Sequence, residues 1–354
     1  MSAPALPARR HPQMTQLTEA LVCVQPGQLR VEQRPAPAAE SGHVLVRPRR
    51  VGICGTDYHI YEGNQPFLAY PRVMGHELAV EVIENTTGTG PAVGAVCVVN
   101  PYLSCGTCHA CVRGNANCCM KIQVLGVHRD GGMTGLLSLP PRNLIPAEGL
   151  SADECAMVEF LAIGAHAVRR GYVGSADRVL VIGAGPIGLG AALFASLSGA
   201  QVTVMDREID RMTAAQQLFA VHHTILAEGD VAGAVSAFTG GDGFDVVFDA
   251  TGNRKSIEAG FQYVAHGGRY VLVSVVQGDI TFTDADFHRR ETTLLGSRNA
   301  NDTDFERVIQ AIRDGKVKSD AWITHRTTLR GAIEDLPRWA AKKSGLIKAL
   351  IEID

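Results

Sequence analysis

The stretch RVLVIGAGPIGLGAALFASLSGA, residues 178–200, restricts the fold more than any other part of the sequence. An apolar run, a glycine turn and a second apolar run predict a buried strand, a tight turn and a helix. In the G-x-G-x-x-G spacing, the first glycine permits the bend, the second lets a pyrophosphate approach the backbone, and the third lets helix and strand pack closely. The free N–H groups at the helix start would then face phosphates. The candidate cofactor-binding residues of this turn are Gly183, Gly185, Pro186, Ile187 and Gly188.

The segments that follow repeat the pattern and predict a parallel sheet. QVTVMD and FDVVFDATG are apolar strands, REIDRMTAAQQLFA between them is helical, and GGRYVLVSV and TTLLGS supply the last strands. Near-continuous apolar strands that alternate with helices are typical of a doubly wound α/β sheet covered on both faces. We therefore expect an α/β fold from about residue 166 onward.

Asp206 ends the second of these strands, where a carboxylate can accept hydrogen bonds from ribose hydroxyls and repel a 2′-phosphate. This position favours NAD over NADP as the cofactor. Arg211, in the next helix, is a further candidate contact, whereas Arg207 directly after Asp206 keeps NADP open. Asp206 could instead cap the following helix and touch no ligand.

Length and charge limit the remaining possibilities. A chain of 354 residues suits about two domains, and its net charge of −3, without a long run of one sign, offers no footprint for nucleic acid or an anionic membrane. No apolar stretch approaches the roughly 18 residues that span a bilayer, and the start of the chain lacks the apolar core of a secretion signal. We expect a cytoplasmic protein with a small-molecule substrate and a disordered tail over residues 1–14, with an organelle-targeting arm as the alternative.

The segment SCGTCHACVRGNANCC has the cysteine spacing C-x2-C-x2-C-x7-C. It has no core of its own, and thiolates around Zn²⁺ at about 2.3 Å would hold it together. A reducing cytoplasm favours metal ligation over disulfides, which remain the alternative in an exported protein. Cys118 could replace Cys119 after a slip of one residue. The candidate ligands of a structural zinc are Cys105, Cys108, Cys111 and Cys119.

Short alternating strands with frequent Gly and Pro, such as HVLVRPRRVG, indicate a small β-rich domain in the first half. A β-rich core does not explain two motifs in this half. VGICGTDYHIYEGN supplies Cys54, Thr56, Asp57 and His59, and PRVMGHELAV supplies His76 and Glu77. A thiolate, an imidazole and one or two carboxylates are the ligands expected for a catalytic zinc with an open position. Taken singly, each could be a core cysteine or a surface histidine.

A further carboxylate, Glu159, stands in CAMVEFLAIGAHAVRRG, which otherwise has the pattern of a buried helix. An unpaired buried charge costs several kcal/mol, so such a group is normally neutralised, paired or bound to a metal. Glu159 could also point into water or pair with Arg169 or Arg170, and the segment alone leaves these explanations equally open.

Together these motifs resemble the zinc-dependent medium-chain alcohol dehydrogenase family, and within it the polyol and sugar-acid branch of L-galactonate, sorbitol and galactitol-phosphate dehydrogenase-like proteins. The resemblance covers nearly everything after residue 18 and includes VGICGTD, PRVMGHE, GVHRDGG, GAGPIGLG, DATGN and FHRRETTLLGSRNA. It implies a GroES-like β-barrel catalytic domain over residues 1–165, a Rossmann NAD-binding domain over residues 166–297 and a return to the catalytic domain over residues 298–354. It also implies a homodimer or homotetramer, in which the last nucleotide-domain strand pairs across the subunit interface.

The resemblance also assigns roles in the site. Cys54 and His76 match ligands of a catalytic zinc, and Glu77 and Glu159 match two carboxylates that the polyol branch places at that metal. Two zinc ions per chain are therefore expected, one catalytic and one structural, with Cys119 as the last structural ligand. Thr56 matches the hydroxyl that bonds the substrate oxygen, and His59 matches the final proton acceptor of the relay, so both are candidate catalytic residues together with Glu159.

The expected reaction is hydride transfer between a secondary alcohol of a polyol or sugar acid and NAD. Arg298, where the chain leaves the nucleotide domain, could grip a substrate carboxylate bidentately, or else make an interdomain or nicotinamide-side contact. The alternatives are a non-catalytic NAD-binding sensor, a zinc-free quinone reductase, or a relative acting on another alcohol such as threonine or a sugar phosphate. The chain departs from the family pattern at two places. Phe160 replaces a proline, which bears on the angle at which Glu159 approaches the zinc. Residues 133–136 lack an acid and an aromatic residue, which bears on the substrate range.

Overall fold

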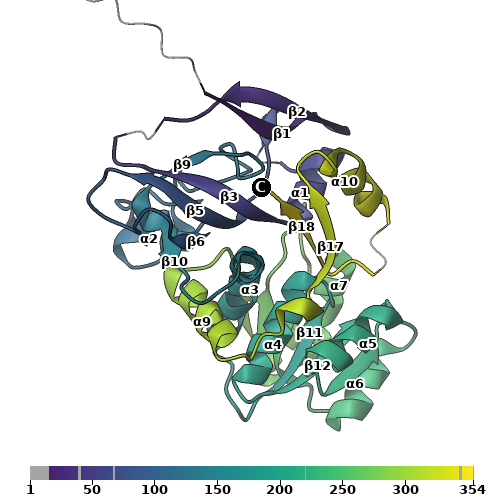
Figure 1. Ribbon diagram of the computed structural model, residues 1–354. Coiled ribbons are helices and arrows are strands. Elements are labelled where there is room, and N and C mark those ends of the chain that lie inside the picture. Colours follow the sequence, from purple (N-terminus) through teal and green to yellow (C-terminus); the bar gives the residue numbers. More distant parts are fainter. Residues whose placement is uncertain (1–15, 39–40, 67, 220, 343–344, 354) are drawn as a thin grey trace, which may run out of the picture.

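The computed structural model describes residues 16–38, 41–66, 68–219, 221–342 and 345–353, so the tail expected over residues 1–14 lies outside the described residues. The chain forms a β-rich part and a part built on a parallel sheet. The long helix α3, Ala152–Arg170, lies between the two parts (Figure 1). This confirms the expected combination of a β-rich part with an α/β part built on a parallel sheet.

The β-rich part is built on a sheet of seven strands in the order β10-β6-β5-β3-β18-β17, with β9 paired to β3. Two of these strands come from the far end of the sequence: β18 pairs antiparallel with β3, and β17 runs parallel to β18 (Figure 1). A hairpin of β1 and β2 joins β4 in a separate sheet, and β7 pairs with β8. The strands are β1 Leu17–Gln25, β2 Gln28–Pro35, β3 Val44–Ile53, β4 Arg72–Val73, β5 Glu77–Asn85, β6 Val96–Val99, β7 Tyr102–Leu103, β8 Gln123–Val124, β9 Leu137–Leu139, β10 Leu144–Pro146, β17 Ile323–Thr328 and β18 Lys348–Glu352.

The second part is a six-stranded sheet in the order β13-β12-β11-β14-β15-β16, in which all neighbours are parallel. Each strand and helix expected from the sequence between residues 178 and 297 is present. Strand order reverses between β11 and β14, the position where doubly wound sheets bind nucleotides. The elements are β11 Arg178–Ile182, α4 Pro186–Leu197, β12 Gln201–Asp206, α5 Ile209–Leu218, β13 His223–Leu226, α6 Val231–Thr239, β14 Phe244–Asp249, α7 Arg254–Gly260, β15 Val264–Leu272, α8 Asp284–Arg289 and β16 Thr293–Gly296.

Helix α3 connects the two parts. It begins at Ala152 after a capping box formed by Ser151 and Glu154, and most of its side chains are buried. It contacts β3, β5 and β6 of the large sheet as well as α4. Gly164 lets α4 approach, because a Cβ there would lie 2.5 Å from the backbone of Gly190. The expected boundary at residue 165 falls inside this helix, so one element carries Glu159 and also packs on α4 of the second part.

The remaining helices complete the β-rich part. α9, Asp302–Arg313, packs on α3, and α10, Ala332–Ala341, contacts the short α1, Gly55–Glu62. The cysteine-rich lobe contains α2, His109–Val112. Within the described part of the chain, no helix is both long and apolar enough to cross a membrane.

Candidate active site

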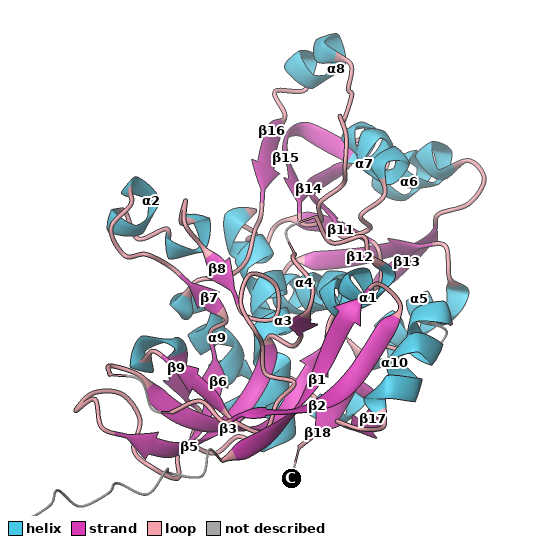
Figure 2. Cartoon of the chain, turned by 90° about the horizontal axis from the view of Figure 1, so that it is seen from above, coloured by secondary structure: helices cyan, strands magenta, loops and turns pink. Residues whose placement is uncertain are grey.

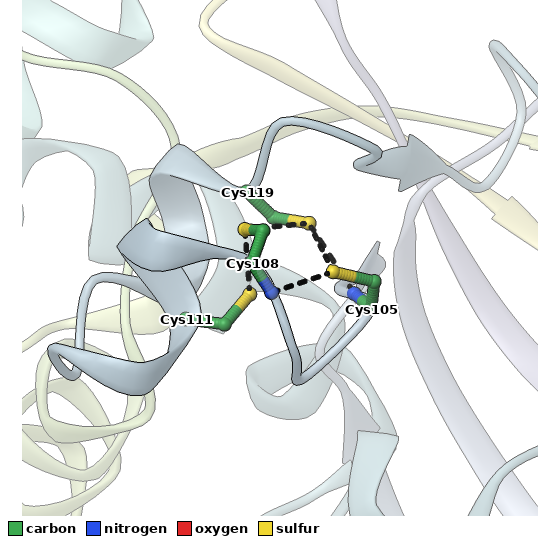
Figure 3. Close-up of side chains that lie close together, drawn as sticks. All are labelled: Cys105, Cys108, Cys111 and Cys119. Carbon is green, nitrogen blue, oxygen red and sulfur yellow. Dashed lines mark hydrogen bonds between the residues drawn. The ribbon is translucent and has the colours of Figure 1, made fainter.

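The cysteine-rich lobe brings the thiols of Cys105, Cys108, Cys111 and Cys119 within 4.8 Å of one another (Figure 3). The Sγ–Sγ distances are 3.5 Å for Cys108–Cys111 and Cys105–Cys119, and 3.9 Å for Cys108–Cys119. They exceed a disulfide bond of about 2.05 Å and approach the roughly 3.8 Å between sulfurs placed tetrahedrally at about 2.3 Å from one ion. All nine cysteines are free thiols, and the exposed Cys118 is not part of this group.

Hydrogen bonds from the backbone prepare these thiols to act as ligands. The N–H of Cys108 donates to Sγ of Cys105 at 3.3 Å, and the N–H of Cys105 donates to Sγ of Cys119 at 3.3 Å. Hydrogen bonds from Thr107 lower the pKa of Cys105 to about 5, whereas burial raises the pKa of Cys111 to about 11. A zinc ion deprotonates coordinating thiols outright, so this donor set fits Zn²⁺. Figure 2 shows the lobe, with α2, beside β7 and β8.

A second cluster unites Cys54, His76 and Glu77, each of which offers a ligand atom within 4.8 Å of the other two. Cys54 follows β3 and Glu77 opens β5, and the pairing of these strands places Gly52 opposite Glu77. Gly52 has to be a glycine, because a Cβ there would lie 2.0 Å from Oε2 of Glu77. Nδ1 of His76 is buried without a hydrogen-bond partner among the described residues. A thiol, an unsatisfied imidazole and a carboxylate in contact are a donor set that fits zinc.

Asp57, which the sequence offered as a candidate ligand of the catalytic zinc, is not in this cluster. Its Oδ2 accepts from the N–H of Cys54 at 2.9 Å and its Oδ1 accepts from the N–H of Gly75 at 3.3 Å. Burial raises the pKa of this carboxyl, which is fully enclosed. Asp57 therefore joins the backbones of the two ligand-bearing loops and lies outside the group that could hold a metal.

Glu159 is buried at 3% exposure, and its partner is the hydroxyl of Tyr102, which donates to Oε1. Burial, followed by the charge of Glu159, holds the pKa of Tyr102 well above its usual range, so the phenol keeps the proton it donates. Burial raises the pKa of Glu159 to about 7. Glu159 does not point into water, because it is buried. It does not pair with either arginine, because Arg169 pairs with Asp304 at 2.7 Å and Arg170 donates to a backbone carbonyl. Glu159 lies outside the cluster of Cys54, His76 and Glu77. Sequence analysis did not identify Tyr102 as its partner.

Lys348, the first residue of β18, is the other residue that sequence analysis missed. Its ammonium donates to both carboxylate oxygens of Glu77, at 2.8 Å to Oε1 and 2.7 Å to Oε2, and to the carbonyl of Ile53 at 3.2 Å. It also lies 4.2 Å from the centre of the Phe160 ring. A lysine that is 2% exposed needs such partners, and only the pairing of β18 with β3 brings it here.

Thr56 and His59 lie on α1, two and five residues after Cys54. They are three residues apart, about one turn, so they lie on the same side of the helix. Thr56 is half-buried, and His59 is exposed, with its Nδ1 3.7 Å from Oε2 of Glu62. A hydroxyl near the cluster followed by a solvent-facing imidazole has the order that a proton relay to water requires.

The glycine turn between β11 and α4 has the geometry expected of a phosphate-binding turn. Gly183 has φ of +100°, and a Cβ on Gly188 would lie 1.8 Å from the carbonyl oxygen of Gly183. Nothing lies within 4 Å of the position of a Cβ on Gly185, which is the N-cap of α4, so a ligand can approach the backbone there. Pro186 and Ile187 form the first turn of α4. The turn and the N-terminus of α4 therefore have the geometry at which helices bind phosphate groups, and the binding role of the five residues stays a prediction.

Asp206, at the end of β12, is tied to this turn. Its Oδ2 accepts from the N–H of Ala184 at 2.6 Å, and its Oδ1 accepts from the N–H of Glu208 at 2.9 Å. The carboxylate is half-buried at the edge where the turn emerges, and Arg211 is half-buried on α5 nearby in sequence. Asp206 thus bonds the backbone before α5 and also borders the phosphate-binding turn.

Arg298 lies just beyond β16 with an exposed side chain. Asn117 of the cysteine-rich lobe fixes the backbone of this segment: its Nδ2 donates to the carbonyl of Arg298 at 3.0 Å, its N–H donates to Oδ1 of Asn301 at 3.3 Å, and its carbonyl accepts from Asn299 at 3.2 Å. The lobe that the four thiols hold together therefore positions the segment that carries Arg298.

A hollow of about 740 Å³ is lined by residues other than the candidate metal ligands. Its lining includes Arg34, Arg72 and residues 128–131 of GVHRDGG, with Asp130 paired to both arginines. Neither candidate metal group therefore borders this hollow.

Known proteins match the chain along almost its whole length. Residues 40–149 match the alcohol dehydrogenase GroES-like domain, and residues 186–314 match the zinc-binding dehydrogenase domain. An L-galactonate-5-dehydrogenase of Escherichia coli K12 is 40% identical over 336 residues, 94% of this chain and 98% of that protein. A sorbitol dehydrogenase of Halalkalibacterium halodurans is 31% identical and covers 92% of this chain and 96% of its own length.

A solved structure supports the same relationship. An alcohol dehydrogenase of Escherichia coli CFT073 with bound NADH superposes with a TM-score of 0.90 at 28% identity, over 95% of this chain and 99% of that chain. Both domains thus match one family of enzymes that act on CH–OH groups. The chain belongs to the zinc-dependent alcohol dehydrogenases of the medium-chain type.

Proposed function

We propose that this protein oxidises a secondary hydroxyl of a sugar acid, or of the related polyol, with NAD as hydride acceptor. The observation that carries the proposal is the cluster of Cys54, His76 and Glu77, with Glu159 on the facing helix, at the boundary between the β-rich part and the nucleotide-binding part. The name of the 40% identical relative, an L-galactonate-5-dehydrogenase, supports a sugar acid as the substrate. A screen of aldonates and polyols for substrate-dependent NADH formation tests the proposal, and NADH formation from none of them would reject it.

Cys54, His76 and Glu77, whose ligand atoms lie within 4.8 Å of one another, would hold the catalytic zinc. Glu159 on α3, which lies outside this group, would act at the metal directly or through a bound water. A bound zinc supplies Lewis acidity, which lowers the pKa of a hydroxyl toward neutrality. Tyr102 orients Glu159, and Asp57 fixes the two ligand-bearing loops. These side chains pre-organise the site so that no reorganisation is needed at the moment of reaction.

Thr56 and His59 would carry the substrate proton to water. We expect Thr56→Val to lower kcat by about 10²- to 10³-fold, since it removes the hydroxyl that starts the relay. The zinc content and the NADH affinity should not change. Thr303→Val, at an exposed position of α9, is the matched control. Turnover within threefold of the wild type in Thr56→Val would exclude the relay.

Arg298 would recognise the carboxylate of a sugar acid, because its side chain is exposed while its backbone is fixed by Asn117. We expect Arg298→Ala to raise KM for an aldonate by about 10- to 100-fold and to leave KM for a neutral polyol nearly unchanged, since hydrogen bonds to a charged group contribute about 1.5–3 kcal/mol. Arg289→Ala, at the exposed end of α8, controls for loss of surface charge. Equal effects on both substrates would show that Arg298 does not bind the carboxylate.

NAD is the proposed cofactor because Asp206 places a carboxylate beside the phosphate-binding turn, where it would repel a 2′-phosphate.

The edge strand β16 supports a homodimer or homotetramer. It ends the parallel sheet, and its Thr293 and Leu294 are exposed, so its free backbone edge is suited to pair with a second copy. A cytoplasmic location is proposed on the basis of the free thiols, which a reducing compartment preserves.

A further inference from the structure

A buried group of polar side chains, which the proposed mechanism does not use, joins three segments of the chain. Asn117 belongs to the cysteine-rich lobe, His166 to α3, and Asp304 to the first turn of α9. Their exposures are 4%, 2% and 1%, so water does not compete for their hydrogen bonds. Buried polar side chains are normally hydrogen-bonded, so the partners of these three residues show what the group holds in place.

Asp304 is held as a carboxylate. Nε of Arg169 donates to Oδ1 at 2.7 Å, Nη2 of Arg169 donates to Oδ2 at 3.0 Å, and the N–H of Asn301 donates to Oδ2 at 2.9 Å. Burial would raise the pKa of Asp304, but hydrogen bonds from Arg169 and His166 hold it well below its usual range. An ionised carboxylate can only accept hydrogen bonds. Nδ1 of His166, which lies 2.8 Å from Oδ2, therefore carries a proton and donates to Asp304. Nη2 of Arg169 also lies 3.0 Å from Nδ1, and it has Oδ2 as its acceptor.

Asn117 requires the same arrangement of protons from the other side. Its Nδ2 lies 3.0 Å from the carbonyl oxygen of Arg298, which can only accept, so this end of the amide is the NH₂ group. The second N–H of that group is left for Nε2 of His166 at 3.2 Å, which must then accept. His166 therefore carries its proton on Nδ1 and accepts at Nε2. The hydrogen bonds form one chain with a fixed direction, from the backbone of Arg298 to the carboxylate of Asp304.

Asn117 also holds the segment after β16 through its own backbone. Its N–H donates to Oδ1 of Asn301 at 3.3 Å, and its carbonyl accepts from Nδ2 of Asn299 at 3.2 Å. Asn299 has φ of +54°, in the left-handed region that asparagine adopts more readily than most residues other than glycine. Three hydrogen bonds from one residue of the lobe thus fix the backbone at Arg298 and directly after it, while the side chain of Arg298 is exposed.

The same group fixes this segment relative to the candidate active site. His166 follows Glu159 by seven residues on α3, which is about two turns, so the two side chains lie on the same face of one helix. A carboxylate bound at Arg298 and a hydroxyl oxidised beside Glu159 would then be held at a distance that α3 and the hydrogen bonds of Asn117 set together.

We propose that Asn117, His166 and Asp304 are positioning residues that fix Arg298 relative to Glu159 and thereby set the preference for a sugar acid over a neutral polyol. The inference rests on the proposed function, since it assumes that Arg298 binds the substrate carboxylate. The three residues touch neither substrate nor cofactor and take no part in proton transfer. Their loss should raise KM for the acid and leave kcat near the wild-type value.

The test combines Asn117→Ala and Arg298→Ala in a double-mutant cycle, with an aldonate and a neutral polyol as substrates. Asn117→Ala alone should raise KM for the aldonate by about tenfold, because the backbone of Arg298 loses its anchor. It should change kcat, and KM for the polyol, by less than about twofold. In the Arg298→Ala background, the same substitution should change KM for the aldonate by less than about twofold, whereas a merely structural role would give the same factor in both backgrounds.

Two variants and one control support the cycle. Asn117→Asp keeps the shape of the side chain and removes both N–H donors, so it should raise KM for the aldonate at least as much as Asn117→Ala. Asn299→Gly keeps the positive φ and removes one of the three hydrogen bonds, and we expect it to raise the same KM by about threefold. Should Asn117→Ala fail to fold, Asn299→Gly in both backgrounds decides the question. Thr239→Val, which removes a buried hydroxyl with two hydrogen bonds at the end of α6, controls for loss of stability.

The outcomes separate the two proposals. A wild-type protein that oxidises no aldonate would overturn the sugar-acid function and this inference with it, and so would equal effects of Arg298→Ala on both substrates. The inference alone fails if Arg298→Ala is selective for the aldonate while Asn117→Ala and Asn299→Gly change neither KM, change both equally, or act by the same factor in both backgrounds.

Discussion

Replacing Cys54 by alanine should reduce the zinc content from two ions per chain to one and lower kcat/KM by about 10³-fold or more. The thiol is one of only three side chains whose ligand atoms meet within 4.8 Å in this cluster, so a metal loses a third of its assembled donors. Lewis-acid stabilisation is worth several kcal/mol, and each 1.36 kcal/mol corresponds to about tenfold in rate. Zinc analysis and steady-state kinetics with an aldonate measure the two effects.

The matched control for this variant is Cys97→Ala. Cys97 is fully buried on β6, in the core of the β-rich part. It belongs to neither group of candidate ligands. Its loss should leave both zinc ions and turnover in place. NADH should still bind to Cys54→Ala, because the glycine turn lies in the other part of the fold. Turnover of Cys54→Ala within tenfold of the wild type would contradict a catalytic zinc at this cluster.

The second large effect is expected in the cysteine-rich lobe, where Cys108→Ser should release the structural zinc and lower the thermal midpoint by about 10 °C. The lobe has only four residues of α-helix, a three-residue 3-10 helix and a two-stranded sheet, so the metal would supply much of its folding free energy. A change of 1 kcal/mol in the free energy of unfolding shifts the midpoint by about 2–4 °C in a domain of about 150–250 residues, so a loss of several kcal/mol gives about 10 °C. Differential scanning fluorimetry and zinc analysis measure the change.

Cys118→Ser provides the control, because Cys118 is exposed and adjacent to the ligand candidate Cys119. Cys118→Ser should retain the structural zinc and have the thermal midpoint of the wild type. Cys119→Ser should lose the zinc and have a lower thermal midpoint. The reverse result would mean that the ligand is displaced by one residue. Loss of the lobe should also raise KM for the substrate, since Asn117 of the lobe holds the backbone at Arg298.

Features that depend on neighbours in sequence were predictable. The glycine turn, the strands on both sides of it and the four-cysteine spacing each follow from short stretches, because a tight turn needs Gly183 to adopt a positive φ and a helix needs Gly188 to approach the strand. The two ligand-bearing motifs near Cys54 and His76 were also evident, since the residue types alone indicate metal ligation. For Glu159 the sequence indicated an unusual position but named no partner.

Contacts between distant segments came only from the tertiary structure. Lys348 lies 271 residues from Glu77, and the ion pair exists because β18 returns to pair with β3. Tyr102 reaches Glu159 because α3 packs beside the strands that lead to the lobe. No local pattern distinguishes Lys348 from a surface lysine.

The sequence by itself therefore determined the classes of side chain present at the site, the nucleotide-binding turn and the two candidate metal centres. The tertiary structure decided how each carboxylate is held: Asp57 by two backbone N–H groups, Glu159 by Tyr102, and Glu77 by Lys348. The physical reason is that a buried charge must find its partners within hydrogen-bond distance, and packing, which brings residues far apart in the chain to that distance, selects those partners.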